Sequence, residues 1–75
     1  MSEKNLVYMA NQIGKFFASA SPDEAATQIA DHIASFWDPR MRKAIYHHLD
    51  HGGEDLEPRV REALMILRKK DSEAV

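Results

Sequence analysis

The residue types that could do chemistry in this chain are histidines and basic residues gathered between positions 32 and 51. His47 and His51 stand four residues apart, and His48 and His51 three apart, so either pair would share one face of a helix and could point at one metal ion. Two imidazoles alone make a weak site, because catalytic zinc normally has three protein ligands. The sequence has no cysteine, which excludes thiolate ligands. We therefore predict no resident metal, with His48 partly buried and the other two histidines in solvent.

His32 is the remaining histidine, and it follows Asp31 directly. Adjacent residues of a helix do not face each other, so these two cannot act as a base and its orienting carboxylate. No serine or cysteine nucleophile lies in a recognisable setting. The only paired glycines, Gly52 and Gly53, follow a helical pattern and indicate a helix stop instead of a phosphate-binding loop. The sequence predicts neither catalytic residues nor a cofactor, and His32 is interpreted as a structural or interface residue.

Arg40, Arg42 and Lys43 form a basic cluster at the start of a predicted helix, where the helix dipole disfavours cations by a few tenths of a kcal/mol, roughly. They could pair with Asp31, with Asp38 or with the last carbonyls of the preceding helix. They could instead reach a partner protein, or hold a phosphate at the helix N-terminus. A small nucleic-acid-binding regulator would use the same residues, but a net charge of -2 and a pI near 6.0 argue against it.

Helical spacing of apolar residues supplies the elements that position these side chains. The pattern predicts four helices, over residues 4–19, 22–37, 39–51 and about 55–70. No strand-like alternation occurs, so the predicted fold class is all-α, a single domain of residues 1–75 arranged as a small bundle with antiparallel or steeply crossed neighbours. Residues 71–75 lack apolar periodicity and are predicted to be a frayed tail.

Helix boundaries follow from capping residues. Ser21 and Glu24 have the spacing of a capping box around the second helix start. Asp38 can cap the third helix, with a proline next in the chain. Gly52 or Gly53 can take the left-handed conformation that ends this helix.

The apolar stripes separate an expected core from an expected surface. The predicted inward stripes consist of Leu6, Met9, Ala10, Ile13, Phe16, Phe17, Ala20, Ala26, Ile29, Ala30, Ile33, Phe36, Trp37, Met41, Ala44, Ile45, His48, Leu49, Leu56, Val60, Ala63, Leu64 and Leu67. Val7, Tyr8, Met65 and Ile66 fall off these stripes. Several apolar residues exposed together on so small a protein suggest a protein-binding surface, because monomers seldom leave large apolar patches bare.

The beginning of the chain has no apolar run of the kind found in a signal peptide. No segment has 18 uninterrupted apolar residues, so no membrane span is expected. The absence of cysteine fits a reducing compartment.

Three motifs carry a resemblance to a known family. They are the run MANQI at residues 9–13, the run DHIASFWDPRMR at 31–42, and the two glycines followed by LEP at 56–58. In this order they make the chain similar to the delta subunit of soluble, NAD-dependent formate dehydrogenases that contain molybdenum or tungsten. The resemblance runs from Leu6 to about Leu67.

The resemblance implies a role in a cytoplasmic multisubunit enzyme. The large alpha subunit of that enzyme oxidises formate to carbon dioxide at a molybdopterin centre, and electrons pass along iron–sulfur clusters to flavin and NAD in the beta and gamma subunits. The implied role of the delta subunit, without a cofactor, is to bind the alpha subunit and support assembly or stability of the complex. No nucleic-acid or membrane partner is predicted.

The corner between the second and third helices is the predicted docking site, because tryptophan and arginine are favoured interface anchors. The predicted partner-binding residues are His32, Trp37, Arg40, Arg42, Lys43, Tyr8, Met65 and Ile66. Trp37 also lies on the apolar stripe, so burial against the first helix is the alternative for this residue.

Overall fold

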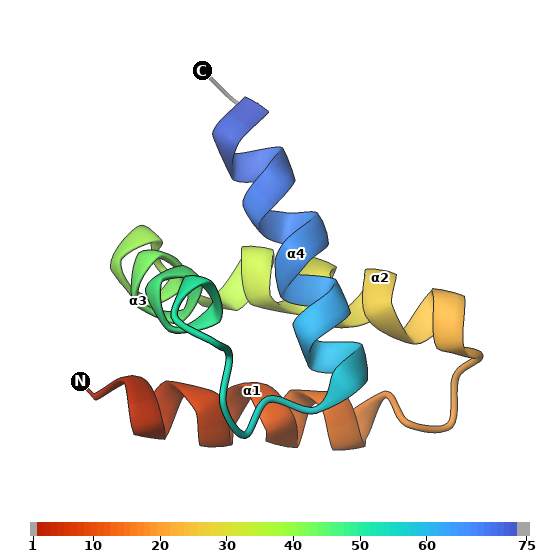
Figure 1. Ribbon diagram of the computed structural model, residues 1–75. Helices are drawn as coiled ribbons and strands as arrows, with labels where there is room; N and C mark the ends of the chain where they lie inside the picture. Colours follow the sequence, from red (N-terminus) through yellow and green to blue (C-terminus); the bar gives the residue numbers. More distant parts are fainter. Residues whose placement is uncertain (1, 74–75) are drawn as a thin grey trace.

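The computed structural model describes residues 2–73, and within them the chain forms four helices and no strand. The helices are α1 (Glu3–Phe16), α2 (Pro22–Phe36), α3 (Pro39–Asp50) and α4 (Pro58–Glu73) (Figure 1). The predicted all-α fold class is confirmed, and the predicted helix starts agree with the structure to within about three residues. No helix in the described part of the chain is both long and apolar enough to cross a membrane.

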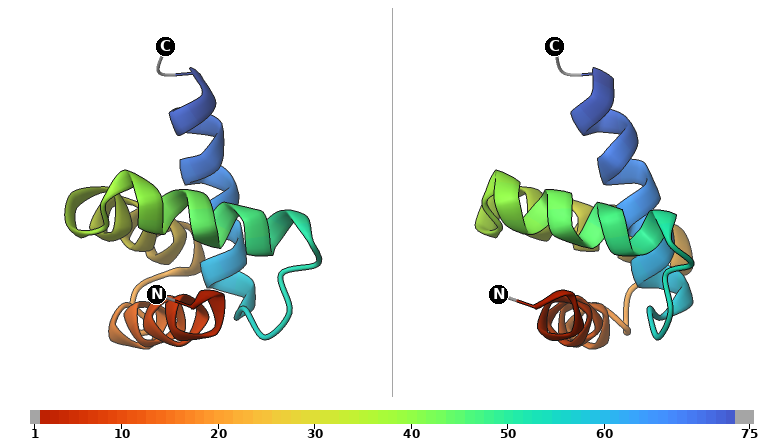
Figure 2. Two further views of the ribbon diagram at one scale, coloured as in Figure 1. Left: turned by 90° about the vertical axis from the view of Figure 1, so that its left-hand side faces the viewer. Right: turned by 60° about the vertical axis from the view of Figure 1, so that its left-hand side comes forward.

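The helices cross steeply instead of forming a parallel bundle. In Figure 1, α1 and α2 run in opposite directions, and α4 stands across both. In the left view of Figure 2, α3 runs across the picture above α1, which is seen end-on. The most extensive packing joins α4 to α2, followed by that of α3 on α1. This arrangement places the core at the crossing of all four helices.

Side chains cap the starts of two helices, α1 and α3. The Asp38 carboxylate accepts a hydrogen bond from the backbone N–H of Met41 at 2.9 Å, as predicted. The Ser2 hydroxyl accepts one from Asn5 N–H at 3.2 Å. The predicted capping box at Ser21 is wrong, because the Ser21 side chain makes no cap hydrogen bond. Its backbone carbonyl instead accepts from Ala25 N–H at 2.7 Å, so the helix starts on backbone bonds alone.

The connection from α3 to α4 begins with the predicted glycine stop. Gly52 and Gly53 have φ angles of 111° and 60°, a region that glycine adopts without steric cost. The Asn11 side chain on α1 makes two hydrogen bonds to the backbone of this connection. Its Nδ2 donates to Asp55 O at 2.8 Å, and its Oδ1 accepts from Glu57 N–H at 3.0 Å. The loop therefore links α1 to the start of α4.

Within residues 2–73, fifteen apolar residues form the buried core. They are Leu6, Val7, Ala10, Ala25, Ala26, Ile29, Ala30, Ile33, Trp37, Ile45, Leu56, Val60, Ala63, Leu64 and Leu67. Three predicted core residues, Met9, Phe16 and Phe36, are exposed, and Val7 is buried although it lay off the predicted stripe, so these predictions are wrong. The inward face of α1 is thus rotated toward Val7 and away from Phe16.

Gly14 explains this rotation. A Cβ atom built at Gly14 would lie 2.6 Å from Cγ2 of Val60, far inside van der Waals contact. Helix α4 therefore approaches α1 where α1 has no side chain. With Gly14 at the contact, Ala10 and Phe17 share the inward side, and Phe16 is directed away from α4.

The last helix is longer than predicted. It continues to Glu73, so residues 71–73 are helical and are not the frayed tail that was expected. Its final turn carries Asp71, which accepts hydrogen bonds from Arg42 and Tyr46 of α3. These contacts hold the turn against α3. Positions 74–75 of the predicted tail lie outside the described residues.

Candidate partner-binding surface

Four aromatic side chains form a continuous row over α1 and α2, and we call Phe16, Phe17, His32 and Phe36 the aromatic row. The ring centroids of Phe16 and Phe17 lie 4.9 Å apart in an edge-to-face arrangement. Phe17 lies 6.0 Å from His32, and His32 lies 4.6 Å from Phe36. These spacings are those of favourable aromatic pairs. The row therefore crosses from the end of α1 to the end of α2 without a gap.

The two ends of the aromatic row are open to solvent. Phe16 is 77% exposed and Phe36 is 73% exposed, whereas Phe17 and His32 between them are half-buried. Beside the row lies a hollow of about 250 Å³ whose lining is almost wholly apolar. Its lining residues are Gln12, Ile13, Phe16, Phe17 and His32. The surface offers exposed aromatic side chains and a recess for an apolar side chain, which suits a protein partner.

Trp37 is the predicted docking residue that the structure places inside the protein. It is only 5% exposed and belongs to the main apolar core. It ends α2 in an extended conformation, and its N–H donates to Ile33 O at 2.9 Å. Because α2 stops here and the chain turns into α3, the indole stays beneath the corner. Trp37 supports the fold and has no surface to offer a partner.

Arg42 is also occupied within the fold. Its Nη1 donates to Trp37 O at 2.8 Å, and its Nε donates to Asp71 Oδ2 at 3.0 Å. Its side chain is only 19% exposed. The alternative of pairing with the last carbonyls of the preceding helix is therefore correct for Arg42, although the acidic partner is Asp71 and not Asp31 or Asp38.

Tyr46 completes this contact, and we call Arg42, Tyr46 and Asp71 the polar joint. The Tyr46 hydroxyl donates to Asp71 Oδ2 at 2.6 Å. Burial, followed by the bond to Asp71, raises the pKa of Tyr46 well above its ordinary value. The Tyr46 hydrogen bond is the main cause that lowers the pKa of Asp71, and Arg42 adds to it. The joint thus favours ionised Asp71 and neutral Tyr46.

Four of the other predicted surface residues are exposed, but they lie on separate elements. Arg40 and Lys43 are exposed at the start of α3. Tyr8 is exposed on α1, and its hydroxyl accepts from Gln12 Nε2 at 3.1 Å. Met65 is exposed on α4, while its neighbour Ile66 is half-buried and packs against the core.

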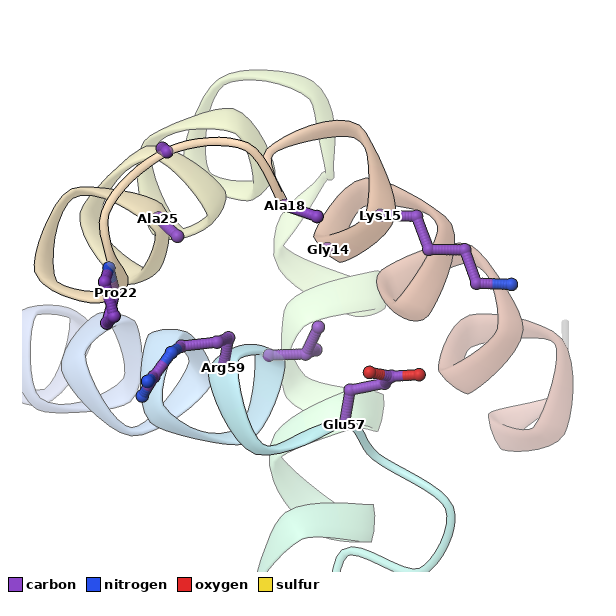
Figure 3. Close-up of a pocket in the computed structure, with 9 residues that line it drawn as sticks. Gly14, Lys15, Ala18, Pro22, Ala25, Glu57 and Arg59 are labelled. Carbon is purple, nitrogen blue, oxygen red and sulfur yellow. The ribbon is translucent and has the colours of Figure 1, made fainter.

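A second hollow lies between the end of α1 and the starts of α2 and α4 (Figure 3). Small residues, including Gly14, Ala18 and Ala25, line much of it. Charged side chains occupy its edge, and Lys15 extends away from it in the view of Figure 3. Arg59, at this edge, forms its salt bridge with Glu62, at 3.1 Å. This hollow reflects the packing of small residues where α4 approaches Gly14.

Sequence reasoning missed Phe16 and Phe36 as surface residues, because both fit an apolar helical stripe. Two signals could have separated them. Phe16 and Phe36 each occupy the last residue of a helix, where fewer neighbouring elements are available to cover a side chain. Gly14, two residues before Phe16, marks the side on which α1 approaches another helix.

The chain matches one family model, described as NADH-dependent formate dehydrogenase delta subunit FdsD, over residues 5–64. This span is about four fifths of the chain, and it contains nearly all of α1, the whole of α2 and α3, and the first turns of α4. All residues of the aromatic row lie within it. Comparisons with curated proteins and with solved structures gave no match.

Proposed function

We propose that this chain, which belongs to the family of NADH-dependent formate dehydrogenase delta subunits, binds the large catalytic subunit of that enzyme through the aromatic row. The observation that carries the proposal is the exposure of Phe16 and Phe36 at the two ends of a continuous aromatic surface. A subunit of a larger enzyme needs a face that another chain covers, and this is the most aromatic face of the described chain.

Energetics support a protein partner for this surface. A fully buried phenylalanine side chain gains about 1.5–3 kcal/mol relative to an exposed one. Phe16 and Phe36 leave most of that gain unused in the isolated chain. Aromatic side chains are enriched at the centres of protein interfaces, where a few residues supply most of the binding energy. The half-buried rings of Phe17 and His32 hold the surface in shape before the partner arrives.

The proposed role is non-catalytic. The described side chains form the fold or face solvent, and the aromatic row has no nucleophile or acid–base pair beside it. We propose that the bound chain supports assembly or stability of a cytoplasmic complex in which the alpha subunit oxidises formate and the beta and gamma subunits pass electrons to NAD. His32 within the row, together with Arg40, Lys43, Tyr8 and Met65, remains a predicted partner contact.

Co-purification tests the proposal. A chain carrying Phe16→Ser and Phe36→Ser would be expressed together with the other subunits, and recovery of the catalytic subunit measured against the parent. We expect recovery to fall at least tenfold while the melting temperature of the isolated chain changes little. The matched control is Gln28→Ser, an exposed position of α2 outside the row. Recovery of the catalytic subunit at the parental level by the double variant would contradict this binding surface.

Nucleic-acid binding by the basic cluster is the alternative function. The structure weakens it, because Arg42 is committed to Trp37 O and Asp71. Phosphate contacts would give an affinity that falls steeply as salt rises. A titration of the chain with duplex DNA across a range of salt concentrations separates the two functions.

A further inference from the structure

We propose that His47 and His51, at the end of α3, form a two-ligand binding site for a late first-row divalent metal ion such as Ni²⁺, Cu²⁺ or Zn²⁺. The site is separate from the aromatic row and does not depend on the proposed function. The centroids of the two imidazole rings lie 4.2 Å apart, and the ring planes are inclined by 32°. Both side chains are exposed, so a hydrated ion can reach them.

The hydrogen bonds of the two rings assign their tautomers. His47 Nδ1 lies 2.9 Å from Glu3 Oε2, and His51 Nδ1 lies 2.8 Å from the backbone oxygen of His47. A carboxylate and a carbonyl can only accept, so each Nδ1 carries a proton that it donates. In the neutral rings, Nε2 therefore carries the lone pair. No hydrogen bond among residues 2–73 uses either Nε2 atom.

This arrangement is the one that metal-binding histidines adopt. Such a histidine donates its second ring N–H to a carboxylate or to a backbone carbonyl, which fixes the tautomer and raises the basicity of the ligating nitrogen. His47 has the carboxylate and His51 has the carbonyl. The sequence spacing alone made this pair a weak candidate. The orientation supplied by Glu3 from α1 and by the helix backbone is what the structure adds.

His48 has the opposite arrangement and is excluded as a ligand. Its Nε2 lies 2.7 Å from Glu54 O, so Nε2 carries the proton and donates it. Its Nδ1 faces Glu3 Oε1 at 3.5 Å. Neither nitrogen is directed at an ion shared with His51. The same helix thus provides a histidine that serves as an internal control.

Two imidazole ligands do not fill the coordination shell of the ion. Within residues 2–73 no group of three histidine, cysteine, aspartate or glutamate side chains converges, so water or another molecule completes the coordination shell. Imidazole ligands favour Ni²⁺, Cu²⁺ and Zn²⁺ over Mg²⁺ and Ca²⁺, which prefer oxygen. An ion bound by both rings bridges the last turn of α3, next to the Gly52 and Gly53 turn, and stabilises the folded helix.

Metal-dependent melting of untagged protein tests the site. The melting temperature would be measured with and without NiCl₂, and separately with ZnCl₂ and MgCl₂, in a buffer that does not bind metals. Calorimetric titration with Ni²⁺ would give the stoichiometry. A ligand that binds only the folded state raises the melting temperature, on the order of 10 °C at about 100 times the Kd. We expect one Ni²⁺ or Zn²⁺ per chain, a raised melting temperature, and no effect of Mg²⁺.

Two variants assign the ligands. The measured quantity in each is the change in melting temperature that the metal causes, so a changed baseline does not affect the result. We expect His51→Gln to lose the metal-dependent rise and His48→Gln to keep it. Acidification should also abolish it, because a protonated imidazole cannot bind a metal. The absence of a rise in the parent, its persistence in His51→Gln, or its loss in His48→Gln would each overturn the proposal.

Discussion

On α1 and α2, Phe16 and Phe36 leave most of their rings in solvent, whereas between α3 and α4 Arg42 is largely withdrawn from it, and Trp37 beside it is buried. The residue types point the other way, since tryptophan and arginine are the usual interface anchors and phenylalanine the usual core residue. The aromatic row and the polar joint thus show that a residue's type does not decide its role in so small a domain. Its position relative to the helix crossings does.

The polar joint also shows why a half-buried arginine does not imply a partner. Arg42 has two acceptors inside the chain, one at the end of α2 and one on the last turn of α4. One side chain thereby connects three helices. Phe16 and Phe36 have no comparable partners beyond the row itself, and this makes the row the better candidate for binding.

The largest expected effect contrasts a core residue with the aromatic row. Ile33 is fully buried, so Ile33→Ala should cost about 2–5 kcal/mol of the free energy of unfolding. Phe16→Ala should change it by only about 0.5 kcal/mol, because surface substitutions usually have effects of that size. Urea or thermal denaturation of both variants measures the contrast. Equal losses in the two variants would mean that Phe16 is part of the core.

Gly14→Ala tests the contact that turns Phe16 outward. The added methyl group would meet Cγ2 of Val60 at 2.6 Å, and β-branched valine has few alternative rotamers. Overpacking of this kind costs about 1–3 kcal/mol, which exceeds the gain of up to about 1 kcal/mol in helix propensity. Thermal melts should show a net loss of stability.

The control for Gly14→Ala is its combination with Val60→Ala, which removes the clashing methyl group. If the clash with Val60 causes the loss, Gly14→Ala should reduce stability less in the Val60→Ala background than in the parent chain. A Gly14→Ala variant as stable as the parent would show that α4 can move away from α1 at little cost.

A smaller effect separates the two arginines of the basic cluster. Arg42→Glu would remove the bonds to Trp37 O and Asp71 and place two carboxylates together, so we expect a loss of about 1–2 kcal/mol. Arg40→Glu, at an exposed position near the positive end of the α3 dipole, should change stability by only a few tenths of a kcal/mol, roughly. Thermal denaturation of the two variants measures this difference in stability. Similar melting of both variants would show that Arg42 has no structural role.

The smallest expected effect is the pH dependence of the polar joint. The folded state lowers the pKa of Asp71 from 3.8, so its stabilising contribution is present above that pH and is lost as the pH falls below it. The pKa of Tyr46 is raised, so its stabilising contribution is present below pH 10.0 and is lost as the pH rises above that value. Since Asp71 is more than a third exposed, we expect less than about 1 kcal/mol from it.

The variant Tyr46→Phe tests both the acid and the alkaline part of this pH dependence. The difference in unfolding free energy between parent and variant should be greatest near neutral pH and should shrink toward acid and toward alkaline pH. A difference that stays constant from neutral to acid pH would show that Asp71 is not coupled to Tyr46.

Several features of the fold and one residue of the candidate site followed from the sequence. The helical periodicity, the Asp38 cap and the glycine stop at Gly52 and Gly53 all act locally, and the structure confirms them. The sequence motifs that resembled formate dehydrogenase delta subunits also lie within the span that the family model matches. His32 was singled out from sequence, and it lies in the middle of the aromatic row.

Tertiary structure alone decided which apolar side chains are covered. A stripe of spacing three and four marks one face of a helix, but its inward direction depends on where the neighbouring helices cross. Gly14 lets α4 come close to α1, which turns Val7 inward and leaves Phe16 outside. The corner after Trp37 buries the indole, and Asp71, 29 residues from Arg42 in the chain, gives that arginine its partner. Contacts between residues so far apart in the chain depend on how the helices pack, and local sequence preferences do not encode that packing.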